Sequence, residues 1–197
     1  MNWLSAEDVR KVAPIVGEGK EVAARIFVMP SEDREAVRRH DASDSGWFHD
    51  PIYFGRYPQE GIDLSGITMP IQGDDLKVIS ERLDWHGLNY YFPAKIGDDP
   101  TGTGMRTTWN HIDGPKTDMG WGMNAGVMRD FLIKLKDHWK APKIYITENG
   151  SAWPDTVDAD GRIRDPQRLA YLLDHLDAAA QAIEAGVDLR GYFGWSL

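Results

Sequence analysis

The chain has 197 residues, of which 42% are hydrophobic and 27% are charged, as in an ordinary globular protein. Its formal net charge of -9 argues against nucleic acid as a partner, because phosphate binding needs clustered Lys and Arg. The absence of cysteine excludes a disulfide framework and thiolate chemistry, which fits a reducing compartment.

The N-terminus lacks the features of a targeting segment. Residues 1–8 have neither a basic region nor a long apolar core, so no signal peptide is expected. No apolar run in the sequence approaches the roughly 18 residues of a membrane span. We therefore expect a cytoplasmic protein that does not enter a membrane.

Residues 1–23 form a segment whose pattern changes too often for one regular element. A helix start at residues 5–8 is soon interrupted by Pro14, Gly17 and Gly19, so we expect an irregular or frayed helix there. We leave residues 1–23 unassigned and treat residues 24–197 as one partial domain.

From residue 24 onward, short apolar runs alternate with helical patterns. The runs of strand length cover residues 24–29, 83–91, 143–147 and 189–197. The predicted helices cover residues 31–40, 75–82 and 125–139, and another begins at Asp165-Pro166 and ends at Gly186. Because the apolar runs are near-continuous, they indicate parallel strands covered on both faces. Alternating strands and helices predict an α/β fold.

One stretch carries no regular pattern. Residues 96–120 are rich in Gly, Asp, Thr and Asn, so we expect a long irregular connection there. Loops of that length within a compact domain are usually functional.

Polar and aromatic side chains occur where three of the predicted strands end. Asn89 and Tyr91 close the second strand, Glu148 follows the third, and Trp195 lies at the tip of the fourth. Because parallel strands end at the same edge of a sheet or barrel, where active sites are built, we expect these side chains to lie near one another.

Each of these residues also has a structural interpretation. Glu148 could be a solvated acid beside an Asn-Gly turn. Asn89 could cap a strand end, and Tyr91 could be a buried phenol bonded to the backbone. Trp121 and Trp195 could serve only in packing.

Several segments, in this order, resemble the C-terminal part of family 1 glycoside hydrolases, the retaining β-glucosidase family. The matching segments are 47–51 (Trp-Phe-His-Asp-Pro), 55–58 (Gly-Arg-Tyr-Pro), 87–91 (Gly-Leu-Asn-Tyr-Tyr), 117–121 (Thr-Asp-Met-Gly-Trp), 145–150 (Tyr-Ile-Thr-Glu-Asn-Gly), 190–193 (Arg-Gly-Tyr-Phe) and 195–197 (Trp-Ser-Leu). The resemblance implies a TIM (β/α)8 barrel, of which this chain holds an incomplete C-terminal half with about four βα units.

The resemblance also implies roles for individual residues. Glu148 matches the catalytic nucleophile, and Tyr91 matches the tyrosine that hydrogen-bonds the nucleophile's carboxylate. Asn89 belongs to the same polar group, Trp195 matches the floor of the sugar subsite, and Trp121 matches an aromatic residue on the leaving-group side. The implied substrate is a β-glucoside or a short β-linked oligosaccharide, with gluco, galacto, fuco and 6-phospho sugars all open, and no metal or cofactor is implied.

A second carboxyl group is missing from this pattern. A retaining glycosidase needs an acid/base carboxyl about 5–5.5 Å from the nucleophile. In the family it lies in an Asn-Glu-Pro motif on the fourth barrel strand, and the sequence contains no such tripeptide. We therefore expect a fragment of a retaining β-glucosidase that is inactive alone. The alternatives are a non-enzymatic half-barrel that self-associates or complements another chain, and a truncated remnant.

Overall fold

The computed structural model describes residues 3–5 and 31–195, which form two compact units. Of the described residues, the sheet unit comprises 3–5, 84–93 and 111–195. The helical unit comprises 31–83 and 94–110. The predicted strand 24–29 lies outside the described residues, as does most of segment 1–23.

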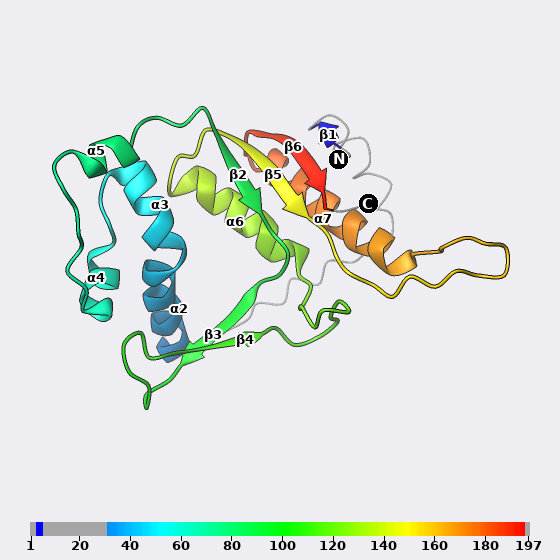
Figure 1. Ribbon diagram of the computed structural model, residues 1–197, viewed down its shortest axis with the longest axis horizontal. Helices are drawn as coiled ribbons and strands as arrows, with labels where there is room; N and C mark the ends of the chain where they lie inside the picture. Colours follow the sequence, from blue (N-terminus) through cyan, green and yellow to red (C-terminus); the bar gives the residue numbers. More distant parts are fainter. Residues whose placement is uncertain (1–2, 6–30, 196–197) are drawn as a thin grey trace. The chain divides into compact units, whose positions relative to one another are not determined.

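The sheet unit is built on three parallel strands with an antiparallel strand at one edge (Figure 1). Strands β2 (Trp85–Asn89), β5 (Lys143–Asn149) and β6 (Leu189–Gly194) run parallel, and β1 (Trp3–Ser5) pairs antiparallel with β6. The order across the sheet is β1-β6-β5-β2. The α/β expectation is confirmed for this unit, because each parallel pair is joined through an intervening helix.

Helices α6 (Ala125–Asp137) and α7 (Pro166–Glu184) pack side by side against the sheet (Figure 1). On β5, Ile144 and Ile146 are buried while Tyr145 between them is less so, as the alternation of side chains along a strand requires. The apolar core also contains Met128, Leu132, Leu135, Trp139, Leu176, Ala179 and Leu189.

Both α6 and α7 begin at a side-chain cap, of which the cap at Asp165 was predicted. The Asn124 side chain accepts a hydrogen bond from Val127 N, and the Asp165 side chain accepts one from Arg168 N. Gly186, just past α7, has a φ of +87°, a conformation that glycine adopts without strain. The prediction for α7 is confirmed, and α6 ends two residues before the predicted Trp139.

The other predicted strands differ slightly from those observed. The pairing between β2 and β5 shifts register at Leu88/Asn89, so β2 is shorter than the predicted 83–91. Strand β5 continues through Asn149, two residues beyond the prediction, and β6 ends at Gly194. Ser5 is the last residue of β1, which pairs with β6, and the rest of the predicted helix start at residues 5–8 lies outside the described residues.

The helical unit contains four helices and a hairpin. The helices are α2 (Ser31–Ser43), α3 (Ser45–Phe54), α4 (Gln59–Ser65) and α5 (Asp75–Ile79), and the hairpin strands are β3 (Ala94–Asp98) and β4 (Thr107–His111), whose last residue belongs to the sheet unit. Helix α2 extends three residues past the predicted end, and α5 stops three residues short of it.

The expectation of an irregular connection over residues 96–120 was wrong in its first half, which contains most of the hairpin. Its strands are polar, so hydrophobic periodicity does not reveal them. Helices α3 and α4 were also missed. Pro51 lies inside α3 and Gly61 inside α4, and both residue types disfavour helix in sequence-based reasoning.

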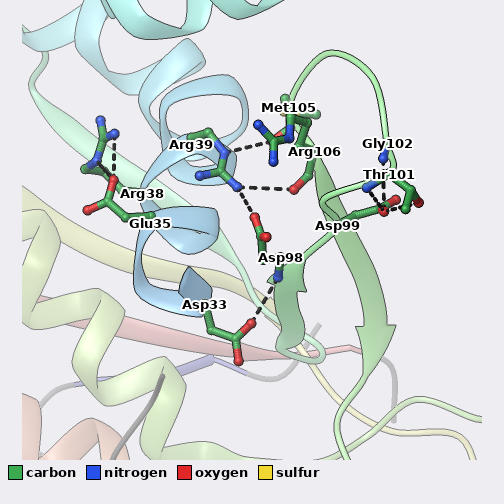
Figure 2. Close-up of polar contacts among 10 residues, drawn as sticks. All are labelled: Asp33, Glu35, Arg38, Arg39, Asp98, Asp99, Thr101, Gly102, Met105 and Arg106. Atoms are coloured by element: carbon green, nitrogen blue, oxygen red, sulfur yellow. Dashed lines mark hydrogen bonds and ion pairs between the residues drawn. The ribbon is translucent and has the colours of Figure 1, made fainter. Parts of the chain in front are cut away.

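Arg39 of α2 ties the helix to the hairpin (Figure 2). Its guanidinium donates to the Asp98 carboxylate at 2.6 Å, to Met105 O at 2.9 Å and to Arg106 O at 3.2 Å. Asp33, six residues earlier on the helix, accepts from Asp98 N at 3.0 Å. Because Arg39 and Asp98 are mostly buried, these contacts hold the hairpin in place.

Across residues 3–5 and 31–195, none of the helices combines the length and the hydrophobicity that a membrane crossing requires.

Replacing Arg39 by Met tests this connection. Because the substitution leaves the Asp98 carboxylate without its charged partner, we expect the helical unit to lose about 2 kcal/mol of unfolding free energy. Amides of β3 and β4 should exchange faster with deuterium. Arg38→Met on the same helix is the control, since among the described residues the exposed Arg38 pairs with the carboxylates of Glu35 and Glu60. Equal losses of unfolding free energy in the two variants would contradict the role of Arg39 in holding the hairpin.

Candidate active site

Glu148 lies near the carboxyl end of β5 and is held by Tyr91, which follows the end of β2. The Tyr91 hydroxyl donates to Glu148 Oε2 at 2.7 Å. The two strands are neighbours and parallel, and Tyr90 N donates to Glu148 O at 2.9 Å. Burial, together with the hydrogen bond to Glu148 and its charge, raises the pKa of Tyr91 far above its ordinary value. The phenol is therefore protonated at neutral pH and acts as the donor.

Asn89 stands opposite Glu148 in the register between β2 and β5. Its amide oxygen accepts a hydrogen bond from the Thr147 hydroxyl at 2.7 Å. The structure therefore brings Asn89 next to Glu148 along the strand ends and bonds it to the residue before Glu148.

Aromatic residues lie close to Tyr91. The Trp121 ring meets the Tyr91 ring edge-on, with centroids 5.6 Å apart, and Phe92 packs on the same indole at 4.8 Å. Trp195, just past β6, is 51% exposed. Tyr91, Trp121 and Trp195 line one open cavity of about 550 Å³. Glu148 is not part of that lining and is connected to the cavity by Tyr91.

Three further residues that line the cavity were missed by sequence reasoning. They are Trp153, Asp155 and Arg168. The Arg168 guanidinium donates to Ser151 O at 3.2 Å, forms an ion pair with Asp155 at 3.3 Å and contacts the Asp165 carboxylate. Its charge is therefore balanced by two carboxylates. The sequence did offer one indication for Trp153 and Asp155, because residues 151–155 directly follow the Thr-Glu-Asn-Gly motif.

Asn149, the last residue of β5, is fully buried and makes a complete set of hydrogen bonds. Its Nδ2 donates to Tyr90 O at 2.7 Å and to the Tyr171 hydroxyl at 3.1 Å. Its Oδ1 accepts from the Tyr192 hydroxyl, and its backbone carbonyl accepts from Trp195 N at 2.8 Å. The residue therefore joins both neighbouring strands and α7 and does not sit in an exposed turn.

Gly150 lets the two strand ends come together. A Cβ at this position would lie 1.8 Å from Trp195 O, closer than any real contact. Only glycine allows the backbone of Trp195 to pass at this distance.

Tyr171 and His175 support this arrangement from α7. Their rings stack at 3.9 Å with an interplanar angle of 25°, and both are almost fully buried. His175 Nδ1 lies 2.7 Å from Tyr171 O, which can only accept, so Nδ1 carries the proton. Burial lowers the pKa of His175 to about 4, so the ring is neutral at neutral pH. Among the described residues, no group of three His, Asp or Glu side chains is placed to share a metal ion.

Comparisons with known proteins agree with this geometry. A sequence model of glycosyl hydrolase family 1 matches residues 17–197. A β-glucosidase from Agrobacterium sp. is 37% identical over 97% of this chain and 43% of its own length. The β-glucosidase from Thermotoga maritima in complex with deoxynojirimycin superposes with a TM-score of 0.79 and 37% identity, covering 87% of this chain and 39% of that one. A psychrophilic β-glucosidase from Micrococcus antarcticus superposes with a TM-score of 0.78 and 35% identity, covering 85% of this chain and 41% of that one.

The chain therefore spans about two fifths of the length of these relatives, as the coverage of 43%, 39% and 41% shows. The solved relatives are TIM barrels, and the described α/β structure matches part of each.

The buried His175 predicts how stability depends on pH. The unfolded chain binds a proton at histidine near pH 6.5, whereas the folded chain does so only near pH 4. Stability contributed by the neutral ring is present above pH 6.5 and is lost as the pH falls toward 4, by about 3 kcal/mol in total. Urea denaturation at intervals of pH measures this loss.

His175→Gln should remove most of that pH dependence between pH 6.5 and 4. His138→Gln, which removes an exposed histidine of the same unit, is the comparison variant. A His175→Gln chain that keeps the full pH dependence of the wild type would contradict the prediction.

Proposed function

We propose, because this chain belongs to glycosyl hydrolase family 1, that Glu148 is the nucleophile of a retaining β-glucosidase site. The match over residues 17–197 confirms the resemblance drawn from the strand-end motifs. The single observation that carries the proposal is the 2.7 Å hydrogen bond from the Tyr91 hydroxyl to Glu148 Oε2 beside an aromatic cavity.

The chemistry requires an ionised carboxylate that attacks the anomeric carbon of the sugar. The bond to the leaving-group oxygen breaks, a covalent glycosyl ester forms on Glu148, and water then hydrolyses it. A phenol that remains protonated donates to the ionised carboxylate and stabilises its charge without taking its role. Tyr91 therefore orients the nucleophile.

The substrate is a β-D-glucoside or a short β-linked oligosaccharide. Trp195 and Trp121 offer aromatic faces in the same cavity, where the apolar faces of a sugar and its leaving group can stack. Asn89, beside Glu148 on the neighbouring strand, supplies an amide for a sugar hydroxyl. Two of the relatives support this substrate class. The relative from Agrobacterium sp. is named a β-glucosidase, and the β-glucosidase from Thermotoga maritima binds deoxynojirimycin.

The acid/base carboxyl group must come from outside these 197 residues, since the sequence contains no Asn-Glu-Pro tripeptide. An incomplete barrel of about four βα units supplies only the nucleophile side of the site. The isolated chain therefore holds a nucleophile without its proton donor.

A non-enzymatic half-barrel that self-associates or complements another chain is the second candidate. Trp85 favours it, because this indole is 52% exposed on β2, the strand at one edge of the described sheet. The mass of the chain in solution, compared with 22.2 kDa for a single copy, distinguishes a self-associating chain from a monomer.

The nucleophile can be tested without the acid/base group. A 2-deoxy-2-fluoro-β-D-glucoside with a dinitrophenolate leaving group needs no protonation to react, and its fluorine slows hydrolysis of the ester. We expect slow addition of one fluoroglucosyl group to Glu148, located by peptide mass spectrometry. Glu148→Gln should remain unlabelled. Labelling of another carboxylate, or equal labelling of the wild type and Glu148→Gln, would contradict the proposal.

Turnover of an ordinary aryl β-glucoside by the purified chain should stay near background. Loss of general-acid assistance alone costs about 10²–10⁴-fold in rate. Release of the phenol, followed by absorbance, measures this rate with Glu148→Gln as the blank. Fast turnover that Glu148→Gln abolishes would show that the chain contains its own acid/base group.

A further inference from the structure

We infer that Tyr171 is a positioning residue that holds the Tyr91 phenol against Glu148. The inference rests on the proposed role of Glu148 and adds a residue of α7 that touches neither the carboxylate nor the cavity that Tyr91 lines. Its basis is a chain of hydrogen bonds within the sheet unit.

Tyr91 needs such support because it lies beyond the regular pairing of the two strands. β2 ends at Asn89, where the register with β5 has already shifted. One further main-chain bond, from Tyr90 N to Glu148 O, joins the segments at 2.9 Å. The side chain of Tyr91 then has to reach back to Glu148 from a backbone that has left the sheet.

The Tyr171 hydroxyl occupies the point where this backbone can be held. It donates to Tyr91 O at 3.1 Å and accepts from Asn149 Nδ2 at 3.1 Å. A carbonyl can only accept and an amide NH₂ only donates, so both directions are determined. The Tyr171 hydroxyl thus connects the backbone of Tyr91 to the side chain of Asn149, the residue after Glu148.

The Tyr171 ring is itself fixed. It is 3% exposed and stacks on His175 one turn further along α7. The His175 ring is anchored by its bond to Tyr171 O. Burial keeps the pKa of Tyr171 above its ordinary value, so the hydroxyl proton remains available for Tyr91 O. The support is rigid and comes from a helix in the packed core.

Tyr171→Phe removes the hydroxyl and keeps the ring, so it tests the bond with little change in packing. The matched control is Tyr90→Phe, which also removes a buried phenol hydroxyl bonded to a backbone carbonyl, that of Asn124 at 2.7 Å. The control leaves the bonds at Tyr91 O and Asn149 in place. Urea denaturation of both variants measures their stability, which should fall by similar amounts.

The first readout is the ¹³Cζ NMR resonance of Tyr91 in the ¹³C-tyrosine-labelled chain, assigned with Tyr91→Phe. This resonance reports the hydrogen bond to Glu148 and should move when Glu148 is replaced by Gln. We expect Tyr171→Phe to move it in the same direction and Tyr90→Phe to leave it in place. A Tyr91 resonance at the same chemical shift in Tyr171→Phe and Tyr90→Phe would overturn the inference.

The second readout is the rate at which the dinitrophenyl fluoroglucoside labels Glu148. A small displacement of a reacting group costs large factors, so we expect labelling about 10-fold slower in Tyr171→Phe and nearly unchanged in Tyr90→Phe. Equal rates in both variants would also overturn the inference. If the wild type is not labelled while the Tyr91 resonance responds as expected, the positioning role stands and the proposed function fails.

If Tyr171→Phe does not fold, the wild-type chain still tests the bond. A buried phenol proton bonded to Tyr91 O exchanges slowly, so transfer into D₂O should produce a delayed isotope shift of the Tyr171 ¹³Cζ resonance. Absence of that shift would overturn the inference.

Discussion

The buried amide of Asn149 is the interaction on which the rest of the sheet unit depends. A primary amide without partners is expensive to bury, and in this low-dielectric interior each of its bonds is strengthened. Here its two donors and its acceptor are all used, by Tyr90, Tyr171 and Tyr192. The amide therefore specifies how the ends of β2, β5 and β6 meet α7, and any other arrangement would leave it unsatisfied.

The position of the carboxylate follows from that constraint. The register of β5 with β2 shifts between Ile146 and Glu148, so Asn149 is buried like Ile144 and Ile146, whereas Glu148 stays partly exposed at the strand end. Tyr91 meets the carboxylate there, because its own backbone is held by Tyr171 on the core side. Gly150 then allows Trp195 to pass close by, which brings an indole from β6 to the same cavity. Buried hydrogen-bonded residues thus support the accessible residues that line the cavity.

The parts that the sequence predicted well are those with strong local patterns. Helix α7 shows an apolar stripe, an Asp165 cap and a terminal Gly186, and it was placed almost to the residue. The β3–β4 hairpin was missed because its polar strands have no hydrophobic period, and the contacts of Arg39 come from a distant helix. Helix α3 was missed because Pro51 contradicts the local rule, which the tertiary environment overrides.

By itself the sequence determined that Glu148, Tyr91 and Trp195 lie at strand ends, because apolar runs of strand length stop beside them and the order of motifs indicates the family. Only the tertiary structure decided that Tyr91 bonds Glu148 across 57 residues and that Asn149 is bonded to Tyr171 and Tyr192. The reason is physical. Local pattern indicates which residues form a strand, whereas the partner of a buried polar group depends on which distant segments pack against it.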